Sequence, residues 1–206
     1  MKPAREAGFV VSDRPADPIH RVRSMHEAEL KQTDTGLVPQ GDGWWLANLA
    51  DISWFSLPDN GTWCSLDAPD APNPHFGIGI HILRPGEPSA KYHAESTQEA
   101  FIVLAGECRL IVEGQERIMR QWDAFYCAPT TAHITIGAGD GPCAILMVGA
   151  RGPHDTEYLV EPLAAKYGAS VAEHTTDSKV AYADRRGDIT AAKAPWPPET
   201  WPTANL

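Results

Sequence analysis

The central part of the chain, residues 75–150, is a succession of short apolar runs broken by glycine and proline turns. In order, the runs are HFGIGIHIL, EAFIVLAG, CRLIVEGQERIMR, WDAFYCAP, HITIG and CAILMVGA. They follow each other at roughly ten-residue spacing, which is typical of antiparallel sandwiches and barrels. A tight hairpin connection at Gly114 divides the third run, and the strand–helix alternation of a parallel sheet does not occur. The sequence therefore predicts an all-β, antiparallel fold.

Composition narrows the kinds of partner that this chain can have. The formal net charge of −10 excludes binding to nucleic acid or to anionic membrane surfaces, because no Lys and Arg cluster offsets it. The N-terminal residues lack the apolar core of a signal peptide, and CAILMVGA is too short to span a bilayer. The four cysteines show no CxxC pairing, so we expect free, mostly buried thiols in a cytoplasmic protein.

Three segments are expected along the 206 residues. Residues 1–40 form a polar N-terminal extension, in which residues 24–34 could be a short helix. Residues 41–150 form the β domain, beginning with Trp-rich, β-prone sequence. Residues 151–206 form a C-terminal extension with a short helix in EPLAAKYGAS, where proline begins the helix and glycine ends it. The extension ends in a Pro-rich tail whose Trp196 and Trp201 either pack onto the β domain or a neighbouring subunit, or are disordered.

The stretch YHAESTQEAFIVLAGE places His93, Glu95 and Glu99 at the mouth of an apolar strand. These three residues share parity, so their side chains are expected on one face of the strand unless the turn-like STQ between them breaks the register. Carboxylates close together repel each other unless a proton or a cation lies between them. A divalent metal satisfies this requirement, and His133, which follows a Pro-Thr turn and begins another apolar strand, can supply an additional imidazole.

At these residues the sequence resembles the cupin superfamily, small β-barrels of the jelly-roll kind. The first cupin motif runs from a glycine through His-x-His and a glutamate to a second glycine. Gly86, His93-Ala94-Glu95, Glu99 and Gly106 match it. The second motif is matched from Asp123 through Pro129 to His133, with Thr130 in place of the usual glycine and Gly137 in place of the asparagine.

The resemblance covers about residues 76–150 and implies a jelly-roll β-barrel with a metal centre. His93, Glu99 and His133 occupy metal-ligand positions of the family, while Glu95 replaces the second histidine of His-x-His. The resulting two-His, two-carboxylate set suits Mn, Fe, Ni or Zn. A metal-dependent enzyme acting on a small molecule, of isomerase, lyase or dioxygenase type, is therefore expected. The alternative is a cupin that binds a small molecule without turning it over. Cupin relatives commonly pair, which implies a homodimer.

Three of the four proposed ligands also have a purely structural interpretation. Glu95 can be a solvated residue at the rim of the barrel, Glu99 can pair with Arg109 on the next strand, and His133 can be a hydrogen-bonded core histidine. His81, on the preceding strand, is expected to be structural or to line the pocket.

Parity also makes predictions about three neighbouring side chains. It places Tyr92 outside the pocket. Tyr126 and Cys127 are adjacent and have opposite parity, so one of them should line the cavity, and the sequence leaves open which.

Overall fold

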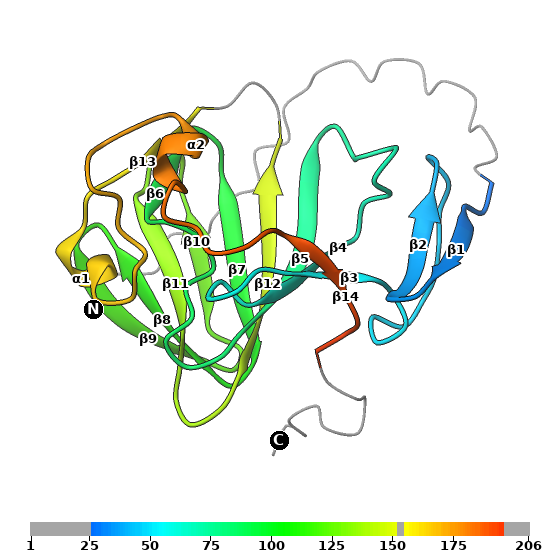
Figure 1. Cartoon of the computed structure of the whole chain (residues 1–206), viewed down its shortest axis with the longest axis horizontal. Coiled ribbons are helices and arrows are strands. Elements are labelled where there is room, and N and C mark those ends of the chain that lie inside the picture. Colours follow the sequence, from blue (N-terminus) through cyan, green and yellow to red (C-terminus); the bar gives the residue numbers. More distant parts are fainter. Residues whose placement is uncertain (1–25, 152–154, 196–206) are drawn as a thin grey trace, which may run out of the picture.

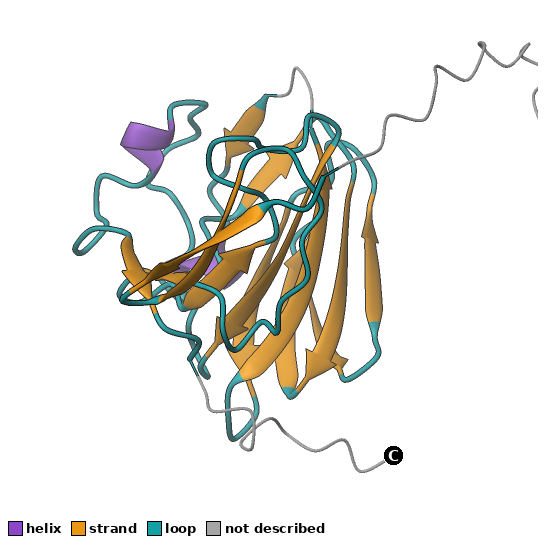
Figure 2. Cartoon of the chain, turned by 90° about the vertical axis from the view of Figure 1, so that its right-hand side faces the viewer, coloured by secondary structure: helices purple, strands orange, loops and turns teal. Residues whose placement is uncertain are grey.

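A computed structural model describes residues 26–151 and 155–195. Strands are the main regular secondary structure of this part of the chain, and every pairing between them is antiparallel (Figures 1 and 2). The chain therefore has the all-β architecture that its alternating apolar runs predict. Among the described residues, no helix is both long and apolar enough to cross a membrane.

Seven strands form the larger sheet, in the order β10-β7-β12-β5-β4-β3-β14. Their bounds are β3 Trp54–Ser56, β4 Thr62–Ser65, β5 Phe76–Leu83, β7 Glu99–Ala105, β10 Ala124–Cys127, β12 Cys143–Ala150 and β14 Thr190–Ala192. The second sheet has the order β13-β6-β11-β8-β9. Its bounds are β6 His93–Glu95, β8 Glu107–Val112, β9 Gln115–Arg120, β11 His133–Ala138 and β13 Thr156–Tyr158. Each sheet keeps two free edge strands in the described part of the chain, so the pair is an open sandwich rather than a closed barrel.

The two sheets pack face to face around an apolar core. Its buried members come from both sheets and include Leu83 of β5, Val103 of β7, Cys108 of β8 and Ile145 of β12. All four cysteines are buried and free, as the sequence predicted. Burial raises the pKa of the Cys108 thiol to about 12, so this thiol stays protonated and packs as an apolar group.

Segments from outside the central strands cover the outer faces of both sheets. On the five-stranded sheet, Ile111 and Ile134 pack against Ala164, which belongs to the short helix α1, Pro162–Ala165. The seven-stranded sheet is covered by the Trp-rich segment around residues 45–54, whose Trp45 and Leu49 pack against the buried cluster that contains Ile80 and Ile82 of β5. The apolar residues on both faces of the β7 sequence are therefore buried in part within the same chain.

The two extensions differ in how well the sequence anticipated them. The C-terminal helix is confirmed: Pro162 occupies its first turn, and Gly168 follows it with a φ of +68°. The helix expected over residues 24–34 is wrong. Residues Glu29–Thr33 are instead strand β1, paired with β2, Gly36–Gln40, in a hairpin that stands beside the sandwich (Figure 1).

The reason for this error is the turn between the two strands. The Thr33 hydroxyl donates to the Gly36 carbonyl, which closes the hairpin. Gly36 has a φ of +137°, and a Cβ there would lie 2.6 Å from the Asp51 carbonyl oxygen. This close approach favours the hairpin over a helix. Helix α2, Ser178–Ala181, and strand β14 were not predicted, and Trp196 and Trp201 lie outside the described residues.

Candidate metal centre

Three of the four proposed ligands come together between the two sheets. His93 of β6 and His133 of β11 are direct partners in the five-stranded sheet. Glu99 begins β7 in the opposite sheet, and its Oε2 lies 3.3 Å from His133 Nε2. One ligand atom from each of these residues lies within 4.8 Å of the others, which is close enough for all three to contact one ion. The structure brings His93, Glu99 and His133 together, but not on one face of a single strand as parity predicted. Residues 96–98 interrupt the strand, so that His93 and Glu99 lie on β6 and β7 in opposite sheets.

Backbone carbonyls orient both imidazoles. His93 Nδ1 lies 2.7 Å from the Lys91 carbonyl oxygen, and His133 Nδ1 lies 3.0 Å from that of Thr131. A carbonyl only accepts, so each Nδ1 carries the hydrogen and each Nε2 keeps a free lone pair. Metal-binding histidines commonly have their second nitrogen held in this way. In both cases the carbonyl belongs to the residue two positions earlier, and no sequence pattern identifies such a contact.

The electrostatics of the three groups favour a positive charge between them. Burial, followed by the proximity of Glu95, raises the pKa of Glu99 to about 7. Burial and the neighbouring His93 lower the pKa of His133 to about 4, and burial also lowers the pKa of His93. Glu99 Oε2 is buried and has no hydrogen-bond partner in the described part of the chain. A divalent cation would satisfy this oxygen and bind both neutral imidazoles.

Glu95, the fourth proposed ligand, lies beside the group rather than within it. Its Oε1 is 3.9 Å from His93 Nε2, and its Oε2 accepts a hydrogen bond from the Thr97 hydroxyl at 3.4 Å. It is not among the residues whose ligand atoms all lie within 4.8 Å of one another. A role for Glu95 in binding the metal therefore stays a prediction.

Aromatic rings and a thiol surround His133. The rings of Phe101 and Phe125 lie 5.3 Å and 5.8 Å from its imidazole, centroid to centroid. Cys127 Sγ is 3.4 Å from His133 Nδ1, whereas Tyr126 is 63% exposed. Of these two adjacent residues, Cys127 therefore faces the interior. The sequence could not distinguish them because the start of the strand was not known.

The structural interpretations of Glu99 and Tyr92 can also be compared with the structure. Arg109 does not pair with Glu99: its guanidinium contacts Glu116 and lies over the ring of Tyr167 at 5.4 Å. Tyr92 is buried in the cluster on the outer face of the five-stranded sheet, away from His93, as parity predicted.

Both departures from the second cupin motif have a visible backbone consequence. Thr130, at the usual glycine position, has a φ of 67°, a conformation that a β-branched residue rarely adopts. Gly137, at the usual asparagine position, lies against the segment that follows β5, and a Cβ there would be 2.0 Å from the Arg84 carbonyl oxygen. The turn therefore has a backbone shape that glycine favours although it carries a threonine, and β11 makes a close backbone contact at Gly137.

The fold and the site define a double-sheet β protein with a buried His/Glu group between its sheets. Residues 79–149 match the family model of the Cupin domain. The chain is therefore a cupin-superfamily protein, and the matched segment contains all four residues proposed as ligands. No curated protein matches the chain.

Solved structures of similar shape include other cupins. A sugar phosphate isomerase of the cupin superfamily from Silicibacter pomeroyi is 25% identical, with a TM-score of 0.43 over 48% of this chain and 64% of that one. A putative sugar phosphate isomerase from Acidithiobacillus ferrooxidans is 24% identical, with a TM-score of 0.42 over 48% and 65%. A polyketide cyclase from Streptomyces resistomycificus is 20% identical, with a TM-score of 0.40 over 46% and 69%. The chain thus spans less than two thirds of the length of the first two.

Proposed function

We propose that this cupin is a metal-dependent enzyme that acts on a small molecule. His93, Glu99 and His133 would hold one divalent first-row ion, with Glu95 as a fourth ligand. The observation that carries the proposal is the unpartnered, buried Oε2 of Glu99, which faces two imidazoles whose Nε2 atoms are free. Nitrogen and carboxylate ligands together suit Mn, Fe, Ni or Zn.

A bound metal would supply Lewis-acid chemistry or the activation of oxygen, which places the reaction among the isomerase, lyase and dioxygenase types. The protein residues have simpler tasks. The carbonyls of Lys91 and Thr131 fix the imidazole orientations, and Phe101 and Phe125 keep water away from His133. Three or four protein ligands leave room for a substrate in the coordination sphere of a metal that accepts five or six ligands.

Metal analysis of the full-length protein tests the centre. We expect about one first-row ion per chain, and a strong loss of metal in His133→Ala and Glu99→Gln. His174→Ala and Glu173→Gln are matched controls, because these residues are exposed and remote in sequence from the three ligands; both should retain the metal. Wild-type protein that stays metal-free after incubation with Mn, Fe, Ni and Zn salts would refute the proposal.

The exchange of water at the metal separates an enzyme from a cupin that only binds a small molecule. Protein loaded with Mn²⁺ should enhance the relaxation of solvent water protons strongly, because an open coordination position exchanges water rapidly. A catalytic centre requires this open position. Relaxation no greater than that of a fully enclosed ion would favour the non-catalytic alternative.

A further inference from the structure

A second feature of the interior is a cavity of about 560 Å³ with an unusual charge. Trp63 of β4, His81 of β5 and Ser89 form one part of its lining, and Tyr182, Lys179 and Arg185 of the C-terminal segment form another. The lining therefore contains two cations, and it contains no carboxylate. The chain has a net charge of −10, so the charge of this lining is opposite in sign to that of the chain as a whole.

Neither cation is neutralised by the protein. Within residues 26–151 and 155–195, no carboxylate forms an ion pair with Lys179 or Arg185. Nearby Asp184 is already engaged, since its Oδ2 accepts a hydrogen bond from the buried Lys91 at 2.7 Å. Both side chains are solvent-exposed where they line the cavity. Two unpaired cations side by side attract an anion to this part of the surface.

His81 offers a polar group on the opposite wall. Its Nδ1 is buried and has no hydrogen-bond partner in the described part of the chain, and its ring stacks on that of Trp63 at 5.7 Å. Burial lowers the pKa of His81 to about 4, so the imidazole is neutral at physiological pH and presents one donor and one acceptor. A buried nitrogen without a partner is costly in the ligand-free protein, and a ligand in this cavity would satisfy it.

The cavity adjoins the candidate metal centre. The hydroxyls of Ser89 and Thr135 lie 2.9 Å apart, and Thr135 shares its face of β11 with His133. On the other side, the ring of Tyr158 lies between the cavity and the metal centre. Its centroid is 5.6 Å from that of the Tyr182 ring and 6.2 Å from that of the His93 ring. A molecule in the cavity is thus separated from the metal centre by little more than the Tyr158 ring.

We propose that this cavity binds the carboxylate or phosphate group of a small organic anion, with Arg185 and Lys179 pairing with the negative charge. His81 and Tyr182 hydrogen-bond to the remainder of the molecule, whose far end is directed toward His93 and Glu99. This inference rests on the proposed function, because it assigns a substrate class to the same interior. It also separates the roles of the chain: strands hold the metal, and the C-terminal segment selects the anion.

Anion binding can be tested on the full-length protein by thermal unfolding and titration calorimetry with inorganic phosphate and with succinate as probes. At constant ionic strength and millimolar concentration, at least one of the two should bind saturably to the wild type. Arg185→Gln and Lys179→Gln should each weaken binding roughly tenfold, the loss expected for one charge-assisted hydrogen bond. The ratio between the two probes distinguishes a phosphate site from a carboxylate site.

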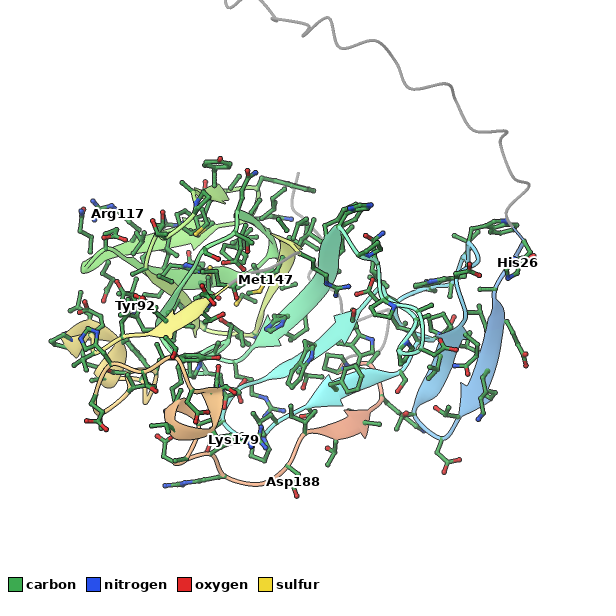
Figure 3. All side chains as sticks on the ribbon, turned by 90° about the horizontal axis from the view of Figure 1, so that it is seen from above. His26, Tyr92, Arg117, Met147, Lys179 and Asp188 are labelled. Carbon is green, nitrogen blue, oxygen red and sulfur yellow. The ribbon has the colours of Figure 1, made fainter. Side chains whose placement is uncertain are left out.

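Two controls remove net charge without touching the cavity lining. Arg186→Gln changes the next residue along the chain. Arg117→Gln changes a residue on β9 that lies well away from Lys179, as Figure 3 shows. Both should bind the probe as tightly as the wild type. The proposal is overturned if neither probe binds, or if the controls lose as much affinity as the two cavity variants.

Repeating the titration after chelation separates this proposal from that of the metal centre. Anion binding that persists without metal, and still depends on Arg185 and Lys179, supports the cavity assignment even if metal analysis fails. Metal binding with no saturable anion binding would instead retain the metal centre and exclude the anion site.

Discussion

Thr130 shows what a single residue contributes to the shape of the metal centre. Its backbone is left-handed, and its amide donates a hydrogen bond to the Glu95 carbonyl oxygen, with 2.6 Å between nitrogen and oxygen. This bond links the turn before His133 to the end of β6. For a β-branched residue this conformation costs about 1–3 kcal/mol. The hydrogen bond and the turn therefore persist at the expense of local strain.

Replacing Thr130 with glycine should relieve that strain. The gain is offset in part by the greater flexibility of glycine in the unfolded chain, so Thr130→Gly should raise the free energy of unfolding by about 1 kcal/mol. Chemical denaturation measures this change. Thr131→Gly is the matched control, because residue 131 is outside the left-handed region and should be destabilised by the same substitution. Equal destabilisation in both variants would contradict the strain argument.

Glu95 is the site residue whose role depends most on a measurement. If it is a ligand, Glu95→Gln should weaken metal binding at least about tenfold and leave the unfolding temperature of the metal-free protein unchanged. Thr97→Val removes only the hydrogen bond to the Glu95 carboxylate and should have a smaller effect. Equal metal affinity in Glu95→Gln and wild type would leave His93, Glu99 and His133 as the complete set of protein ligands.

His81 should make stability depend on pH in a defined direction. Its pKa is about 4 in the folded protein and 6.5 when unperturbed, so the unfolded chain binds a proton more readily between these values. Its contribution to stability is full above pH 6.5 and is lost as the pH falls toward 4, by about 1.4 kcal/mol per pH unit. His81→Phe keeps the stacking on Trp63 and removes the titration.

The difference between the unfolding curves of wild type and His81→Phe isolates this contribution. That step matters because Glu99, whose pKa is raised, acts in the opposite direction. A difference that does not vary between pH 6.5 and 4 would show that His81 is not buried as a neutral group.

At the scale of elements, β11 depends on a glycine where cupins usually have an asparagine. Gly137 accepts a hydrogen bond from the Gly86 amide and donates one to the Glu87 carbonyl, so the loop after β5 is held against the strand backbone. Gly137→Ala should lower the free energy of unfolding by about 1–3 kcal/mol, because the new Cβ collides with the Arg84 carbonyl. Gly141→Ala is the control: its Cβ would meet nothing within 4 Å, and stability should be unchanged.

The elements also show what could be read from the sequence. The alternation of apolar residues gave the central strands, and Pro162 with Gly168 gave α1, because these signals are local. The cupin motif positions pointed to His93, Glu99 and His133, whereas parity alone did not, because residues 96–98 separate β6 from β7. The contributions of Lys91, Thr131 and Tyr158 were missed because they depend on a backbone carbonyl or on a contact across the sheet. The cations of the cavity were missed because their segment returns to the sandwich from a distant part of the chain.

At the scale of the whole molecule, we expect a two-fold dimer. The Trp-rich segment covers much of the outer face of the seven-stranded sheet, yet Leu46 within it is 84% exposed and Trp44 is 53% exposed. Exposed aromatic and aliphatic side chains of this kind commonly form the core of an interface. Sedimentation at micromolar concentration should give twice the chain mass of 22.4 kDa, and Leu46→Glu should restore the monomer. A wild-type monomer under these conditions would contradict the predicted dimer.

The path of the C-terminal segment has a consequence for how such a protein can change. After β13 in one sheet the chain runs through α1 and α2 to β14 in the other, and Asp184 along the way is bound by Lys91. His93, Glu99 and His133 all lie on strands that precede this segment in the chain. Insertions, deletions or exchanges within residues 172–189 would thus alter the mouth of the interior while leaving those strands intact. Exchanging residues 172–189 between homologues would therefore change which ligands enter the interior. Grafting this segment would be the natural starting point for redesign.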